Sequence, residues 1–292
     1  MLDDVLKELG LTMVRQFMNS HKPKGAYEVM NEVGASLVLK YSQSEAGIQE
    51  IVTNLKGFKK LGQYAPHVYA SDIRADSAYI LMQNLGNDFS SMSVMSTDNA
   101  KSYTDLVKEL EQLYNVSLHT LQDEQACFLS GMLEIYRLID DDFYKDYLGS
   151  SIEVIHKIKQ HFLFSVNTQT FSCWNFRPTN VYLNNGKIKI TSPLSKLNGV
   201  PIIDLAVFAG VARDVLALPG SQQGYELLYN FATTRVATLL GIRESKAIKL
   251  FHAGRILQLL KGIKSRLLEG KPVIANEYKQ DILNQCKLIE SI

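Results

Sequence analysis

The sequence predicts an α+β protein in which a small antiparallel sheet is followed by a large, mostly helical region. Alternating apolar residues separated by short turn-forming segments, which are typical of strands, are concentrated in residues 1–86. Apolar residues recur at helical spacing through most of residues 87–292. Inside this second region two short alternating runs flank Asn184-Asn185-Gly186. Because Asn and Gly accept the positive φ angles of a tight turn, a hairpin is expected there.

Composition and charge are those of an ordinary globular protein. Hydrophobic residues make up 46% and charged residues 21% of the 292 residues, which is enough for a substantial core. The formal net charge of +1 gives no general attraction to nucleic acid or to an anionic membrane. We therefore expect neither as a partner.

The cysteines and the first residues favour a reducing compartment. Cys127, Cys173 and Cys286 have no metal-binding spacing, and their odd number argues against a disulfide framework. The first residues are acidic and lack the basic-then-apolar order of a signal peptide. No run approaches the ~18 apolar residues that a membrane span requires. We expect a cytoplasmic protein.

Residues 1–86 contain the elements of the expected sheet. A short helix is predicted over 2–9 and a longer one over 45–61, where Ile48, Val52 and Leu55 recur on one face. The strands are expected at 12–17, 26–30, 35–41, 66–70 and 78–82.

The second region is predicted to be helical after a flexible start. Residues 88–99 are polar and rich in Ser, which is typical of a flexible connection. The late helices carry many Lys and Arg residues, a pattern usual for a solvated face but also suited to an acidic partner. Helices are expected at 105–114, 125–139, 151–164, 207–218, 225–240, 244–260, 263–268 and 277–292, with Gly241 and Gly270 as stops.

One loop and the hairpin after it carry a resemblance to a known family. Residues 171–183 contain Cys173-Trp174-Asn175, then Pro178 and Asn180, and the hairpin is followed by Asp204-Leu205-Ala206. This order resembles the core of the aminoglycoside phosphotransferase and choline kinase group, relatives of the protein kinases. The resemblance implies a bilobal protein-kinase-like fold. Its antiparallel-sheet N-lobe would be 1–86, with a hinge near 83–86, and its helical C-lobe, 87–292, would carry the catalytic loop 171–183.

The resemblance also implies roles for single residues around a bound nucleotide. Lys40 stands where the family has its phosphate-binding Lys, and Glu50, or alternatively Glu45, would pair with it. Backbone groups of Gln83 and Leu85 would meet an adenine ring. Asn180 stands on the loop Asn that helps to hold Mg²⁺ against the phosphates. Asp204 would brace the catalytic loop, and it is also suited to capping the helix that follows.

The chain departs from the family at the two residues that carry the chemistry. Asn175 replaces the catalytic Asp, and an amide has no titratable carboxylate with which to act as a general base. Ser192 replaces the metal-binding Asp, whereas Mg²⁺ sites are normally built around carboxylates. We therefore expect a catalytically impaired pseudokinase that acts as a regulatory or protein-binding module and engages a protein partner, or a small ligand, in the cleft between the lobes. It would use no metal, and either no cofactor or ATP bound weakly without metal.

Other interpretations remain open from the residues alone. The chain could be an unconventional small-molecule phosphotransferase or nucleotidyl transferase in which Asp72 or Asp76 replaces a lost carboxylate. Alternatively, Trp174 and Phe176 could fill the ligand site. A papain-like role for Cys173 is disfavoured because the only downstream histidine, His252, lies in a strongly helical run.

Overall fold

A computed structural model describes residues 2–17, 24–96, 98–119, 135, 138–158, 161, 176–184, 187–193 and 201–292. The chain divides into two compact units. The first unit contains residues 1–88 together with residues 180–195, and the second contains the rest. The sequence-based division placed all of 87–292 in one lobe. The contacts instead group the hairpin, which is far along the chain, with the amino-terminal sheet.

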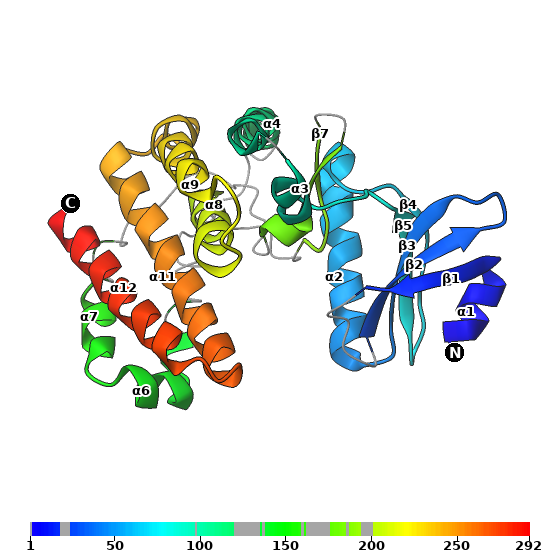
Figure 1. The fold of residues 1–292 in the computed structure, drawn as a ribbon, viewed down its shortest axis with the longest axis horizontal. Coiled ribbons are helices and arrows are strands. Elements are labelled where there is room, and N and C mark those ends of the chain that lie inside the picture. Colours follow the sequence, from blue (N-terminus) through cyan, green and yellow to red (C-terminus); the bar gives the residue numbers. More distant parts are fainter. Residues whose placement is uncertain are drawn as a thin grey trace. The chain divides into compact units, whose positions relative to one another are not determined.

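A five-stranded antiparallel sheet is the centre of the first unit (Figure 1). Its strand order is β1-β2-β3-β5-β4, so β1 and β4 form its edges. The turn between β2 and β3 is tight, because Gly34 takes φ 80° and donates its N–H to the carbonyl oxygen of Asn31. The strands are β1 (Leu11–Gln16), β2 (Lys24–Asn31), β3 (Ser36–Ser42), β4 (Val68–Ile73) and β5 (Ala78–Gln83).

One helix covers each face of this sheet (Figure 1). Helix α1 (Leu2–Glu8) packs Val5 and Leu6 against the face that bears Leu39 and Tyr41. Successive side chains of a strand point to opposite faces, so Lys40 lies on the other face, which α2 (Glu45–Leu61) covers. Helix α2 starts where the sequence predicts, because the Ser44 side chain accepts a hydrogen bond from the Gly47 N–H and caps it.

The predicted hairpin is confirmed, and it belongs to the first unit. Strands β6 (Val181–Asn184) and β7 (Lys187–Ile190) pair antiparallel, and the 3₁₀ turn η3 (Pro178–Asn180) precedes them. Lys189 joins the hairpin to η1 (Gly62–Tyr64), since its Nζ atom donates to the carbonyl oxygens of Gln63 and Ala65 at 2.7 and 2.9 Å. The turn residues Asn185 and Gly186 lie outside the described residues.

The second unit is helical. The long helix α11 packs against both α8 and α12, and α4 packs against α9 (Figure 1). The helices are α3 (Phe89–Met95), α4 (Asn99–His119), α6 (Asp142–Leu148), α7 (Ser151–Lys157), α8 (Pro201–Gly210), α9 (Ser221–Asn230), α10 (Ala237–Leu239), α11 (Glu244–Leu268) and α12 (Pro272–Ser291), with π-helical turns at η4 (Val211–Val215) and η5 (Phe231–Val236).

Three sequence-based predictions in this unit are wrong. Residues 88–99 are not a flexible connection throughout, because Phe89 is fully buried against Tyr103 and Phe208 and anchors α3. Residues 244–268 form one helix and not two. Gly262 does not interrupt it, and a Cβ there would lie 2.7 Å from the Tyr278 ring. Helix α12 begins before 277, with Pro272 in its first turn, where the missing N–H costs nothing.

Asp204 does not cap a helix, because α8 begins at Pro201 and places the carboxylate inside its first turn, where Asp204 is 5% exposed.

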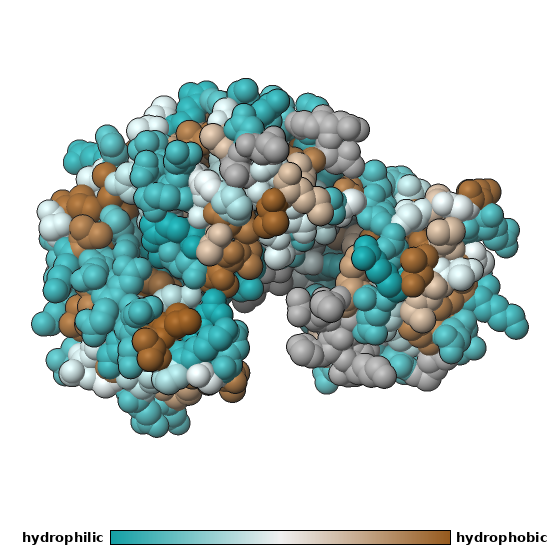
Figure 2. Space-filling view, viewed as in Figure 1, coloured by the Kyte–Doolittle hydropathy of each residue, from teal (hydrophilic) through white to brown (hydrophobic). Residues whose placement is uncertain are grey.

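The viewed surface over α9 and α12 is largely hydrophilic, with small and separate hydrophobic areas (Figure 2). Within the described ranges, no helix combines the length and apolar character needed to cross a bilayer.

Candidate functional site

The Lys40 side chain lies at the centre of a polar cluster in the first unit. Its Nζ atom donates to the Ser192 Oγ atom at 2.5 Å and to the Asn54 Oδ1 atom at 3.1 Å. Strand β3, helix α2 and the segment after β7 therefore meet at one ammonium group. A hydroxyl and an amide are neutral, so these two partners add no negative charge beside Lys40.

Asn54 is the member of this cluster that the sequence analysis missed. It is fully buried, and its Nδ2 atom donates to the carbonyl oxygen of Pro193 at 3.1 Å, so both ends of the amide are bonded. One turn further along α2, Gly57 leaves room for Pro193, because a Cβ there would lie 2.5 Å from the proline Cγ atom. A signal did exist in the sequence. Asn54 interrupts the buried stripe formed by Ile51, Phe58 and Leu61.

Ser192 occupies the position at which the family resemblance implies a metal-binding Asp. Its φ angle is 56°, a left-handed value that is uncommon for residues other than Gly, Asn and Asp. Asn180 lies nearby in the hairpin, where its carbonyl oxygen accepts from the Thr191 N–H at 2.9 Å. The loop Asn and the residue at the metal position therefore meet at the open end of one hairpin.

The described part of this site does not fit a Mg²⁺ ion. The Ser192 oxygen is neutral and already accepts a hydrogen bond from the Lys40 ammonium group, which would repel a divalent cation at that oxygen. Among the described residues, no three His, Cys, Asp or Glu side chains are grouped so that they could hold a metal ion.

Glu28 is a second polar centre, on the same sheet face as Lys40. It pairs with Val38, two residues before Lys40 on β3, so the three side chains share a face. Its carboxylate accepts from Arg15 Nε at 2.6 Å, from Ser36 Oγ at 2.8 Å and from Asn84 Nδ2 at 3.3 Å. The hydrogen bond from Ser36, followed by the hydrogen bond and the charge of Arg15, lowers the pKa of Glu28.

Asn84 links Glu28 to the segment predicted as the hinge. Its Oδ1 atom accepts from the Gly86 N–H at 3.0 Å, and Gly86 turns the chain at φ 77°. The Gln83 N–H donates to the carbonyl oxygen of His67 at 2.8 Å, and Leu85 is buried. The ion-paired Glu28 carboxylate is therefore linked through Asn84 to the segment whose backbone, according to the family resemblance, would contact an adenine ring.

The remaining predicted residues are placed as follows. Glu50 is half-buried, one turn before Asn54 on α2, and Glu45 is exposed at the start of that helix. Which of them pairs with Lys40 stays a prediction. Asn175, with Cys173 and Trp174, lies outside the described residues. Phe176 is 2% exposed and packs against Phe208, so it belongs to the core of the second unit.

Asp72 is not placed to replace a lost carboxylate near Lys40. It pairs with Tyr79 on β5, and Lys40 pairs with Ile80, the next residue, so the two side chains point to opposite faces of the sheet. The Asp72 carboxylate also accepts from Arg74 Nε at 2.8 Å. Asp76 accepts from the Ser77 hydroxyl in the turn between β4 and β5.

Comparison with solved structures identifies the fold. The aminoglycoside phosphotransferase APH(2'')-Ib, solved with ADP, is 13% identical, and the match spans 98% of both chains with a TM-score of 0.58. The amicoumacin kinase hAmiN, solved with AMP-PNP, Ca²⁺ and Ami, is 14% identical over 97% of this chain and 93% of that chain, with a TM-score of 0.53.

The chain has the fold of the aminoglycoside phosphotransferases. An aminoglycoside phosphotransferase from Alicyclobacillus acidocaldarius, 11% identical over 96% of this chain and 93% of its own, gives a TM-score of 0.48. No protein-family model and no curated protein sequence matches the chain. The predicted bilobal, kinase-like fold class is confirmed, with an antiparallel sheet in the first unit of this aminoglycoside phosphotransferase fold and helices in the second.

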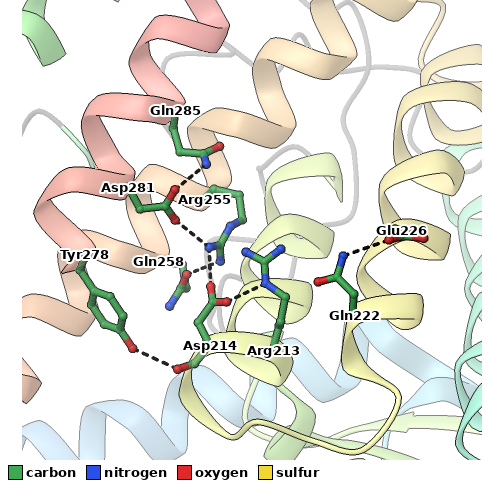
Figure 3. Close-up of polar contacts among 9 residues, drawn as sticks. All are labelled: Arg213, Asp214, Gln222, Glu226, Arg255, Gln258, Tyr278, Asp281 and Gln285. Carbon is green, nitrogen blue, oxygen red and sulfur yellow. Dashed lines mark hydrogen bonds and ion pairs between the residues drawn. The ribbon is translucent and has the colours of Figure 1, made fainter. Parts of the chain in front are cut away.

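The second unit contains a buried charged cluster of its own (Figure 3). Arg255 on α11 is fully buried and forms ion pairs with Asp214 in η4 and with Asp281 on α12, the latter at 3.3 Å. Arg213 donates to Asp214 at 2.7 Å, and its guanidinium group lies 4.0 Å from the centre of the Tyr225 ring. Two cations and two carboxylates balance one another, and this cluster joins α11, α12 and η4.

Proposed function

We propose that this protein keeps the phosphotransferase fold but does not transfer phosphate efficiently, and that it acts as a regulatory module that binds a protein partner. One observation carries the proposal. The Lys40 ammonium group is hydrogen-bonded to the Ser192 hydroxyl at 2.5 Å, at the position where phosphate transfer requires a metal-binding carboxylate.

The charge balance of this cluster supports a metal-independent role. Phosphoryl transfer relies on cations that neutralise the developing charge and on a residue that orients the attacking hydroxyl. Ser192 supplies a neutral oxygen in place of a carboxylate, and the sequence supplies Asn175 in place of the catalytic base. Loss of general-base assistance alone lowers a rate by roughly 10²–10⁴.

The position of Glu28 argues against tight nucleotide binding. A purine ring held by the backbone of Gln83 and Leu85 would lie near the sheet face that carries Glu28 and Val38. Burying a carboxylate against an apolar ring costs free energy unless its hydrogen bonds are kept. ATP would therefore be held mainly by its phosphates at Lys40, without metal.

Turnover measurements test the loss of phosphate transfer. The full chain is incubated with ATP, with Mg²⁺ or Mn²⁺, and with a panel of small alcohols and amines. We expect no phosphorylated product above the background of a heat-denatured sample. Robust turnover that Asn175→Ala abolishes would contradict the proposal.

Thermal unfolding tests the mode of nucleotide binding. We expect ATP to raise the melting temperature slightly and equally with and without Mg²⁺, and we expect Lys40→Met to remove this rise. Lys56→Gln, at an exposed position of α2, is the matched control. A rise that requires metal would count against a metal-independent site.

The protein partner is tested by purification of the tagged full chain from its native source after cross-linking. We expect a stoichiometric second protein that remains bound through gel filtration. Recovery of this chain alone, at native abundance, would contradict the partner proposal and leave the enzymatic result untouched.

A further inference from the structure

A cavity of about 440 Å³ lies in the first unit, and Lys40, Asn54 and Ser192 are not among the residues that line it. The last turns of α2, the turn η1, the start of β4 and strand β7 form its walls. This volume falls in the range of small-molecule sites, which is about 300–1,000 Å³.

One side of the cavity is apolar. Phe58 is 5% exposed, Pro66 is buried, and Leu55 and Val68 are half-buried. These side chains come from α2, from β4 and from the segment between them. The apolar side of the cavity is therefore formed where the end of the helix meets the start of the strand. A ligand with an apolar body would gain free energy by covering it.

The titratable side chains of the cavity are all basic. Lys59, His67 and Lys189 line it, and no Asp or Glu does. Lys59 and His67 are exposed at the rim, and Lys189 is half-buried. Among the described residues, no carboxylate forms an ion pair with any of the three.

The Lys189 ammonium group lines the cavity and can donate a further hydrogen bond. Its Nζ atom donates to the carbonyl oxygens of Gln63 and Ala65 at 2.7 and 2.9 Å, and an ammonium group has three N–H donors. The third is not assigned to any described acceptor. Burial lowers the pKa of Lys189, so its charged form lacks the stabilisation that a bound anion would supply.

We propose that this cavity binds a small organic carboxylate with an apolar body. The body would pack on Phe58 and Val68, and the carboxylate would accept the remaining N–H of Lys189, with Lys59 adding positive potential at the rim. Inorganic phosphate fits less well, because it has no apolar part to cover that surface. The proposal does not depend on whether nucleotide binds at Lys40.

The experiment titrates the full chain with 3-phenylpropionate and follows the backbone amide signals by NMR. We expect saturable shifts at Gln63, Ala65 and Val68. We expect none from the neutral amide 3-phenylpropionamide and none from inorganic phosphate at the same concentration. Equal binding of the neutral amide, equal shifts with phosphate, or no saturation with the acid would each overturn the proposal.

Variants separate the ligand contact from a structural role of Lys189. Lys189→Met should weaken binding by roughly tenfold, because a charge-assisted hydrogen bond is lost. Since Lys189 also holds η1, the exposed His67→Glu provides a second, independent variant, and we expect it to weaken binding of the acid severalfold. Lys56→Gln on the same helix lies outside the cavity and should bind as the unaltered chain does. A loss as large in Lys56→Gln as in His67→Glu would overturn the proposal.

Discussion

Asn54 donates a hydrogen bond to the carbonyl oxygen of Pro193 at 3.1 Å, so helix α2 is joined by a buried side chain to the segment that follows strand β7. The two residues are 139 positions apart in the chain. The other end of the same amide accepts a hydrogen bond from Lys40, so this one side chain bonds both strand β3 and the segment after β7.

Replacing Asn54 should destabilise the protein. Asn54→Ala removes two hydrogen bonds and leaves the buried Pro193 carbonyl without its donor, which we expect to cost about 1–3 kcal/mol of unfolding free energy. Chemical denaturation followed by circular dichroism measures the change. Gln49→Ala, at an exposed position of the same helix, is the control and should change stability little. Because Ala has a higher helix propensity than Asn or Gln, propensity would stabilise both variants, and an equal loss in both would contradict a specific role for the Asn54 amide.

Introducing a carboxylate at residue 192 should create a response to metal. Ser192→Asp places an acceptor of full negative charge beside Lys40 and Asn180, and Asp tolerates a φ of 56° better than most residues do. We expect ATP to raise the melting temperature of this variant more with Mg²⁺ than without it. Ser192→Asn, which has the same shape and no charge, should show no such difference. A metal effect in the Asn variant as well would mean that charge at this position is not what the site lacks.

The buried cluster around Arg255 should be sensitive to loss of one carboxylate. Asp214→Asn weakens the ion pair and leaves the fully buried Arg255 with less compensating charge. We expect the free energy of unfolding to fall by roughly 2–4 kcal/mol. This is near the lower end of the range for breaking a buried ion pair, because 19% of the Asp214 side chain is exposed. Thermal and chemical unfolding measure it. Asp146→Asn, on the exposed surface of α6, is the matched control and should be close to neutral.

His252 should make stability depend on pH below neutrality. Burial lowers the pKa of His252 below the ordinary value of 6.5, although its Nδ1 atom lies 2.7 Å from Gln285 Oε1. The unfolded chain therefore binds the proton more readily than the folded chain. Stability should fall as the pH drops below about 6.5 and should stop falling, for this group, below the lowered folded pKa.

This dependence is isolated by comparison with a variant. His252→Gln cannot titrate, so the difference in unfolding free energy between pH 7.5 and pH 5.5 should be smaller in it than in the unaltered chain. His156→Gln, at an exposed position of α7, should leave the difference unchanged. If His252→Gln had the same pH profile as the unaltered chain, another group would be responsible.

The elements whose signals are local could be predicted from the sequence. The bounds of α2 follow from its apolar periodicity and from the capping Ser44, and the β6–β7 hairpin follows from alternation around Asn-Asn-Gly. Lys40 and Ser192 were singled out by the family resemblance, through their places relative to the strand and to Asp204. The fold class followed from the order of strands and helices together with the loop before the hairpin.

Other features were decided by tertiary packing. Phe89 makes a helix of a Ser-rich segment because it is buried by Tyr103 and Phe208, which are distant in sequence. Nothing in the neighbouring sequence explains the glycine at position 210. A Cβ there would lie 1.7 Å from the Nη1 atom of Arg255, so the buried guanidinium group, 45 positions away in the chain, requires a residue without a side chain.

The sequence by itself determined local elements such as helix α2 and the β6–β7 hairpin, because their signals are properties of neighbouring residues. It also shows neutral side chains at Asn175 and Ser192, where the family resemblance implies carboxylates. Only the tertiary structure decided that Asn54 and Ser192 share the Lys40 ammonium group, and that Glu28 lies beside the predicted hinge. The physical reason is that hydrogen-bond partners are set by distance in space, which periodicity along the chain does not encode.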